Sequence, residues 1–152
     1  MKKWISVALL IFVGASIVKL VLNANQQGNP NDAAPGVTAG TQTVVYYFHG
    51  NVRCKTCNTI EAYTRQTVQG KFADQVEDGA LVMRVINMDG PGNGRYVDDY
   101  QLTSSSVVVA RVKEGTELKW RRLDEVWDLV RDEAAFAGLI ENAIRSAMEG
   151  VE

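Results

Sequence analysis

The sequence predicts an α/β domain built in the order strand, helix, strand, helix, β-hairpin and helix, and three observations lead to this prediction. Short β-branched and aromatic runs alternate with stretches of helical periodicity along residues 43–152. The only two cysteines, Cys54 and Cys57, stand where the first β-type run gives way to a helical pattern. A nearly uninterrupted apolar run at residues 4–22 comes before, so the chain divides into an apolar N-terminal segment and one globular domain.

The apolar run at residues 4–22 is long enough to cross a bilayer, because a transmembrane helix needs about 20 such residues. Lys2 and Lys3 precede it and only Asp32 is charged in the next twenty residues, so the positive-inside rule places residues 1–3 in the cytoplasm. We therefore expect a signal-anchor helix with the rest of the chain on the extracytoplasmic side. A cleaved secretory signal and a buried core helix are the two alternatives for this segment.

A linker and a buried strand are expected next. Residues 23–42 are rich in Asn, Gln, Gly, Ala and Pro and lack an apolar period, which predicts a flexible tether. The globular domain is expected at residues 43–152. Its first element, residues 43–49, is short, β-branched and aromatic, as is typical of a buried strand, and Gly50 and Asn51 end it.

The middle of the domain alternates between helical and strand patterns. From Thr56 apolar and threonine residues recur at helical spacing as far as Gly70, and one or two further helical turns are expected at residues 71–76. Two Asp-Gly turns bound a second strand at residues 80–88. Tyrosine and valine at helical spacing then predict a short helix at residues 93–102.

A hairpin and two helices complete the domain. Residues 106–112 and 117–121 flank a Lys-Glu-Gly-Thr turn, which predicts the hairpin. Two stretches of helical spacing follow, the shorter one headed by Asp124 and the longer one by Asp132, and both aspartates are expected to cap their helices. Gly150 is expected to end the second helix.

The Cys-Lys-Thr-Cys motif predicts a dithiol/disulfide redox site. A sulfur at a helix N-terminus feels the positive end of the helix dipole, and the thiolate that this favours is the nucleophile. Cys54, at the exposed end, is expected to attack a partner disulfide, and Cys57, one turn inward, to resolve the mixed disulfide. The redox-active disulfide would then be the only redox group, without a further cofactor. A purely structural disulfide is the alternative, although so small a loop constrains the unfolded chain little.

The order of elements, with VVYYFHGNVRCKTC at the first strand-to-helix junction, resembles the thioredoxin fold, in which a central mixed sheet is flanked by helices. This resemblance covers residues 43–152 and implies a thiol–disulfide oxidoreductase or the redox partner of another protein. More narrowly, YYFHGNVRCKTCNTIEAYTR resembles the small thioredoxin-like family named as a nitrophenyl-compound nitroreductase subunit.

Three features depart from thioredoxin. The stretch that corresponds to its cis-proline, opposite the dithiol, is residues 103–106 without a proline, so Ser105 and Ser106 are expected there with trans peptide bonds. Phe48 stands six residues before the first cysteine, where thioredoxin has a buried acid. Lys55 and Thr56 replace the Gly-Pro dipeptide, so the redox potential of thioredoxin does not transfer to this chain.

Residues beside the cysteines are candidates for tuning the site. Arg53 and Lys55 would lower the pKa of the Cys54 thiol and make the couple more oxidising than thioredoxin's roughly −270 mV. The alternative is that Arg53 and Lys55 are simply solvated charges in the loop. Thr56 belongs to the dipeptide between the sulfurs, and His49, the only histidine, is a proton donor or orienting group, or else simply ends the strand.

Two other functions stay open. His49, Cys54 and Cys57 could together handle Cu(I) or Zn, although a closed zinc site needs a fourth ligand. The chain could also be an accessory subunit of a reductase complex. The slightly acidic balance, a formal charge of −2, argues against nucleic-acid binding. The expected partner is a protein that carries a thiol or a disulfide, on the extracytoplasmic side of the membrane, where disulfides persist.

Overall fold

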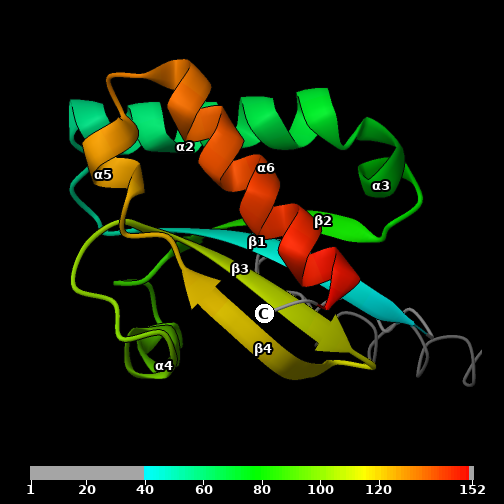
Figure 1. Ribbon diagram of the computed structural model, residues 1–152. Helices are drawn as coiled ribbons and strands as arrows, with labels where there is room; N and C mark the ends of the chain where they lie inside the picture. Colours follow the sequence, from blue (N-terminus) through cyan, green and yellow to red (C-terminus); the bar gives the residue numbers. More distant parts are fainter. Residues whose placement is uncertain (1–39, 151–152) are drawn as a thin grey trace, which may run out of the picture. The chain divides into compact units, whose positions relative to one another are not determined.

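The computed structural model describes residues 40–150 (Figure 1). The elements are β1 (Thr41–His49), α2 (Lys55–Lys71), α3 (Ala73–Glu77), β2 (Leu81–Asn87), α4 (Gly94–Asp99), β3 (Ser106–Lys113), β4 (Thr116–Arg122), α5 (Val126–Leu129) and α6 (Glu133–Glu149). The expected membrane span at residues 4–22 lies outside the described residues, among which no helix is both long and apolar enough to cross a bilayer. Every predicted strand and helix of the globular domain is present.

The four strands form one mixed sheet in the order β2-β1-β3-β4. β1 runs parallel to β2 and antiparallel to β3, and β3 and β4 form the predicted hairpin. A parallel pair needs a crossover connection, which α2 and α3 supply between β1 and β2. This mixed sheet with flanking helices is consistent with the thioredoxin-like fold that the sequence predicts.

β1 lies in the middle of the sheet, and its side chains alternate between two separate cores. Val45 and Tyr47 face α2 and α6, whereas Val44, Tyr46 and Phe48 face α4. Figure 1 shows α2 and α6 over one face of the sheet and α4 on the other. The core under α2 and α6, called here the α2/α6 core, contains Val45, Tyr47, Ile60, Val68, Phe72, Leu81, Val107, Val109, Leu123, Val126, Phe136, Ile140, Ala143 and Ile144.

The second core, called here the α4 core, is rich in aromatic rings. Its buried members are Val44, Tyr46, Phe48, Ile86, Tyr100, Leu102, Val108, Ala110 and Val112. Tyr46 and Phe48 stack with ring centroids 5.5 Å apart, and Trp120 meets Tyr100 edge-on at 5.3 Å. Tyr100 donates a hydrogen bond to the Glu117 carboxylate. Burial raises the pKa of Glu117 by more than the hydrogen bond from Tyr100 lowers it, and the charge of Asp99 raises it further.

Several boundaries and one cap differ from the sequence-based expectation. β1 begins two residues earlier, because Gln42, expected in the linker, is buried and donates from Nε2 to the Gly79 carbonyl at 2.6 Å. Asp132 caps α6 as predicted, since its carboxylate accepts from the Ala135 N–H at 3.0 Å, and Gly150 ends α6 in the left-handed conformation with φ 71°.

Asp124 does not cap α5, and this prediction is wrong. The residue before α5 is Glu125, whose side chain makes no capping hydrogen bond. The Asp124 carboxylate instead pairs with Arg122 at the end of β4, where Oδ1 lies 2.6 Å from Nε and Oδ2 lies 2.9 Å from Nη2. The bidentate pair with the neighbouring guanidinium engages both oxygens of this carboxylate.

Candidate functional site

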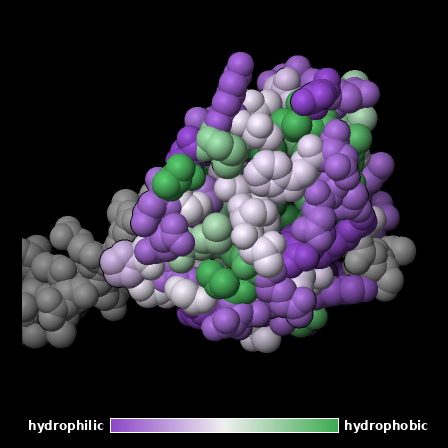
Figure 2. Space-filling view, turned by 90° about the vertical axis from the view of Figure 1, so that its left-hand side faces the viewer, coloured by the Kyte–Doolittle hydropathy of each residue, from purple (hydrophilic) through white to green (hydrophobic). Residues whose placement is uncertain are grey.

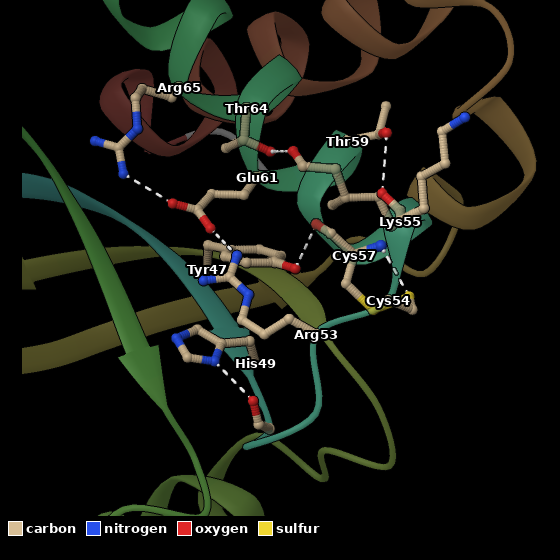
Figure 3. A network of polar contacts seen from close by, with 12 residues as sticks. Tyr47, His49, Arg53, Cys54, Lys55, Cys57, Thr59, Glu61, Thr64 and Arg65 are labelled. Carbon is tan, nitrogen blue, oxygen red and sulfur yellow. Dashed lines mark hydrogen bonds and ion pairs between the residues drawn. A yellow bond between two sulfur atoms is a disulfide. The ribbon is translucent and has the colours of Figure 1, made fainter.

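Cys54 and Cys57 form a disulfide at the start of α2 (Figure 3). Their Cα atoms are 5.0 Å apart. Cys54 is the N-cap residue of α2, and its Sγ accepts a hydrogen bond from the Cys57 N–H at 3.0 Å. Cys54 is exposed, whereas only 6% of Cys57 is exposed. Cys54 is therefore the more accessible of the two cysteines.

The local charge at this helix end favours a thiolate. No acidic residue lies in the first turn of α2, so no carboxylate offsets the positive end of the helix dipole there. The hydrogen bond from the Cys57 N–H points at Cys54 Sγ, the atom that carries the negative charge after reduction. A sulfur placed in this way is a good nucleophile and a good leaving group.

Tyr47 lies directly beneath the second cysteine. Its hydroxyl donates a hydrogen bond to the Cys57 carbonyl at 2.7 Å, and its side chain is fully buried. Burial raises the pKa of Tyr47, and the nearby Ser105 hydroxyl and Arg53 guanidinium lower it less. Figure 3 shows the Tyr47 hydroxyl directed at Cys57, with Arg53 crossing the ring. A neutral phenol therefore joins β1 to the head of α2.

Arg53 takes part in an ion pair along α2. Its guanidinium donates to Glu61, which also accepts from Arg65 at 3.0 Å, and its Cζ lies 5.9 Å from the centroid of the Tyr47 ring. Partial burial raises the pKa of Glu61, but the hydrogen bonds and charges of the two arginines outweigh it and lower this pKa overall. The charge of Arg53 beside Cys54 is thus largely balanced by a carboxylate.

Lys55 and Thr56 occupy the first two positions of α2. Lys55 is exposed and Thr56 is half-buried, and the Lys55 carbonyl accepts from the Thr59 hydroxyl at 3.1 Å. In Figure 3 the Lys55 side chain is directed away from the sulfur atoms. The influence of these two residues on the redox couple stays a prediction.

His49 does not join the cysteines. Its Nδ1 lies 2.9 Å from the carbonyl oxygen of Gly50, next to it in the chain. The imidazole stacks on Tyr47 with centroids 6.2 Å apart, and in Figure 3 Arg53 lies between it and Cys54. Across residues 40–150 no three His, Cys, Asp or Glu side chains gather as metal ligands, so the set of His49, Cys54 and Cys57 is not assembled.

The serine stretch before β3 has internal hydrogen-bond partners. The Ser105 carbonyl accepts from Trp127 Nε1 at 3.0 Å, and the Ser106 hydroxyl donates to the Ser104 carbonyl at 2.9 Å. Ser105 and Ser106 are buried, and no peptide bond is cis in the part of the chain that the structure describes. The hydrogen bond from Trp127 links this stretch to α5.

Tyr47, Glu61 and Trp127 are the site residues that sequence reasoning missed. Phe48, taken as the counterpart of the buried acid in thioredoxin, faces the α4 core instead. Strand alternation offers the signal for Tyr47, because alternate residues of β1 share one face, and helix periodicity offers it for Glu61, two turns after Cys54. No local pattern indicates that Trp127 reaches Ser105, 22 residues earlier.

The surface around the start of α2 is mixed in character. Figure 2 views the molecule from the side where α2 begins, and its apolar side chains form small separate groups among polar ones. Val52, two residues before Cys54, is 86% exposed. This surface suits a transient contact better than a permanent interface, which would be more apolar.

Comparisons with known proteins give matches to solved structures at low similarity. No family model matches the chain, and no curated protein is similar to it in sequence. A malarial protein of solved structure is 14% identical over 68% of this chain and 98% of its own, with a TM-score of 0.41. A thioredoxin from Thermus thermophilus, solved in solution, is 16% identical over 70% of this chain and 76% of its own, also with a TM-score of 0.41. The nitroreductase-subunit resemblance has no support among them.

Proposed function

We propose that this chain is a membrane-anchored thiol–disulfide oxidoreductase whose working group is the Cys54–Cys57 pair. The observation that carries the proposal is the asymmetry of the pair, with Cys54 exposed at the helix N-cap and Cys57 6% exposed behind it. Only the exposed sulfur can meet a sulfur of another protein. The buried sulfur is within bonding distance of the first and can close the disulfide again.

Disulfide exchange proceeds in two steps that balance. The Cys54 thiolate attacks one sulfur of a partner disulfide, the partner's S–S bond breaks, and the partner's other sulfur leaves as a thiolate. The Cys57 thiolate then attacks Cys54 Sγ, forms the intramolecular disulfide and releases the second partner thiolate. Two electrons pass from the dithiol to the partner, and the two cysteine protons balance those taken up by the partner's thiolates. The reverse sequence oxidises a partner dithiol.

The partner is proposed to be a protein on the extracytoplasmic side of the membrane. This part of the proposal is supported by the sequence of residues 1–42, whose apolar run follows two lysines and precedes a nearly uncharged linker. Disulfides persist in that compartment, where a dithiol can cycle between its two states. The small separate apolar groups around the start of α2 agree with a brief encounter (Figure 2).

The proposal is tested by trapping in membranes that contain the full chain. Cys57→Ser removes the resolving sulfur, so a partner attacked by Cys54 should stay attached through a disulfide that a reducing agent releases. Cys54→Ser is the matched control and should trap nothing, because the remaining sulfur is buried. The same species with both variants, or no species under oxidising and reducing conditions alike, would overturn the proposal.

A further inference from the structure

We infer that Tyr47 is a positioning residue for the second step of exchange, holding Cys57 in line to attack Cys54. The inference rests on the proposed function. It concerns the resolving step alone, because Tyr47 contacts Cys57 and not the exposed sulfur. The Cys-Lys-Thr-Cys motif and the strand pattern of the sequence assign no role to the Tyr47 hydroxyl.

The backbone of Cys57 is held from both sides. Its N–H donates to Cys54 Sγ at 3.0 Å, and its carbonyl accepts from the Tyr47 hydroxyl at 2.7 Å. The first contact links it to the sulfur that it must attack, and the second links it to β1. One side-chain hydrogen bond therefore joins the backbone of Cys57 directly to the central strand.

The residue that supplies this hydrogen bond is itself fixed. Tyr47 pairs with Val85 of β2 on one side and Val107 of β3 on the other, so its backbone is in the middle of the sheet. Its side chain has no exposed surface, and both the Arg53 guanidinium, 5.9 Å from the ring centroid, and the His49 imidazole pack against the ring. A buried phenol on a central strand is a rigid support for a reacting group.

The ring of Tyr47 is held independently of its hydroxyl. It belongs to the α2/α6 core, whereas the hydroxyl makes the hydrogen bond to Cys57. Loss of the hydroxyl alone would therefore remove this hydrogen bond and leave the ring packing in place.

The inference predicts a selective kinetic effect. Attack of the Cys57 thiolate on Cys54 Sγ requires close alignment of the two sulfurs, and small displacements of a reacting group slow such steps strongly. Tyr47→Phe removes one buried hydrogen bond to the backbone of Cys57. A bond of this kind corresponds to about a threefold to tenfold change in rate if it is fully used in the resolving step.

The test follows the reaction of the reduced full chain with Ellman's disulfide by stopped-flow absorbance. Attack by Cys54 releases a first nitrothiobenzoate, and resolution by Cys57 releases a second, so one trace gives both steps. Tyr46→Phe is the matched control, since it removes a buried tyrosine hydroxyl from the neighbouring residue on the other face of the sheet.

The expected result is a slower second release in Tyr47→Phe, with the first release and the thermal midpoint like those of Tyr46→Phe. An unchanged second release, or equal slowing of both releases, would overturn the inference, because neither indicates a role specific to Cys57. If the wild-type chain releases no second nitrothiobenzoate, Cys57 does not resolve the mixed disulfide at all. That result overturns the proposed function, and the inference with it.

Discussion

The pairing of Arg53 with Glu61 predicts opposite effects when each partner is neutralised. Glu61→Gln should increase the thiolate fraction of reduced Cys54, because the freed guanidinium then acts on the sulfur. Arg53→Gln should decrease it. Glu61 stands seven residues after Cys54, two helical turns away, which corresponds to about 10 Å along α2.

The size of the effect follows from that separation. Two unit charges about 10 Å apart interact by about 0.4 kcal/mol in water and about 1.6 kcal/mol at an effective dielectric constant of 20. Screening applies because the Arg53 and Glu61 side chains are 32% and 18% exposed. A Debye length of about 8 Å reduces these values about fourfold. The thiolate fraction should therefore change by about 1.2-fold to twofold.

The measurement is the rate of iodoacetamide alkylation of Cys54 in the Cys57→Ser background at a pH where the thiol is mostly protonated. Glu141→Gln is the charge-matched control, since this glutamate pairs with Lys71 at the far end of α2. A slower reaction of Glu61→Gln would refute the electrostatic reasoning. Because Glu61 balances Arg53, the predicted reduction potential of the Cys54–Cys57 couple, more oxidising than roughly −270 mV, depends more on the helix N-terminus than on Arg53.

Two stability predictions follow from the caps and from the α4 core. Asp132→Ala should lower the free energy of unfolding by about 0.5–2 kcal/mol, because the α6 cap is lost. Asp124→Ala should change the free energy of unfolding by less than about 0.5 kcal/mol. Urea titration of the full chain in detergent measures both values. Glu117 has a raised folded-state pKa, so the wild type should lose stability as the pH rises above 4.5. Glu117→Gln keeps an acceptor for Tyr100, and at pH 7 it should unfold at a higher urea concentration than the wild type. The difference between the two urea midpoints should shrink as the pH falls towards 4.5. A difference that does not change with pH would contradict this prediction.

The order of elements could be predicted from the sequence because it is written in local patterns. Alternating β-branched runs and helical spacing give the strands and helices, and the Cys54 and Cys57 spacing places the disulfide at a helix head. Asp132 and Gly150 act where local capping rules place them. These features depend on residues within one or two turns of each other.

The partners of long side chains could not be predicted in the same way. Arg53 could neutralise or stabilise several groups, and only the folded helix brings Glu61 to it. Asp124 fits a capping pattern, but the adjacent Arg122 offers two hydrogen bonds. Phe48 stands six residues before the first cysteine, and its match to the buried acid of thioredoxin assumes that the strand-to-helix connection is the same in both. In this chain Phe48 faces the α4 core, and the alternation of β1 puts Tyr47 beneath the disulfide.

The indole of Trp127 gives this domain an optical property. It packs against the α2/α6 core, whose member Tyr47 donates to Cys57, whereas Trp120 packs on Tyr100 in the α4 core at the other face of the sheet. A disulfide quenches the emission of a nearby excited indole by accepting an electron from it. Reduction of the disulfide should therefore increase the fluorescence of Trp127 and leave that of Trp120 unchanged. The change in emission would report the oxidation state of the domain without a label.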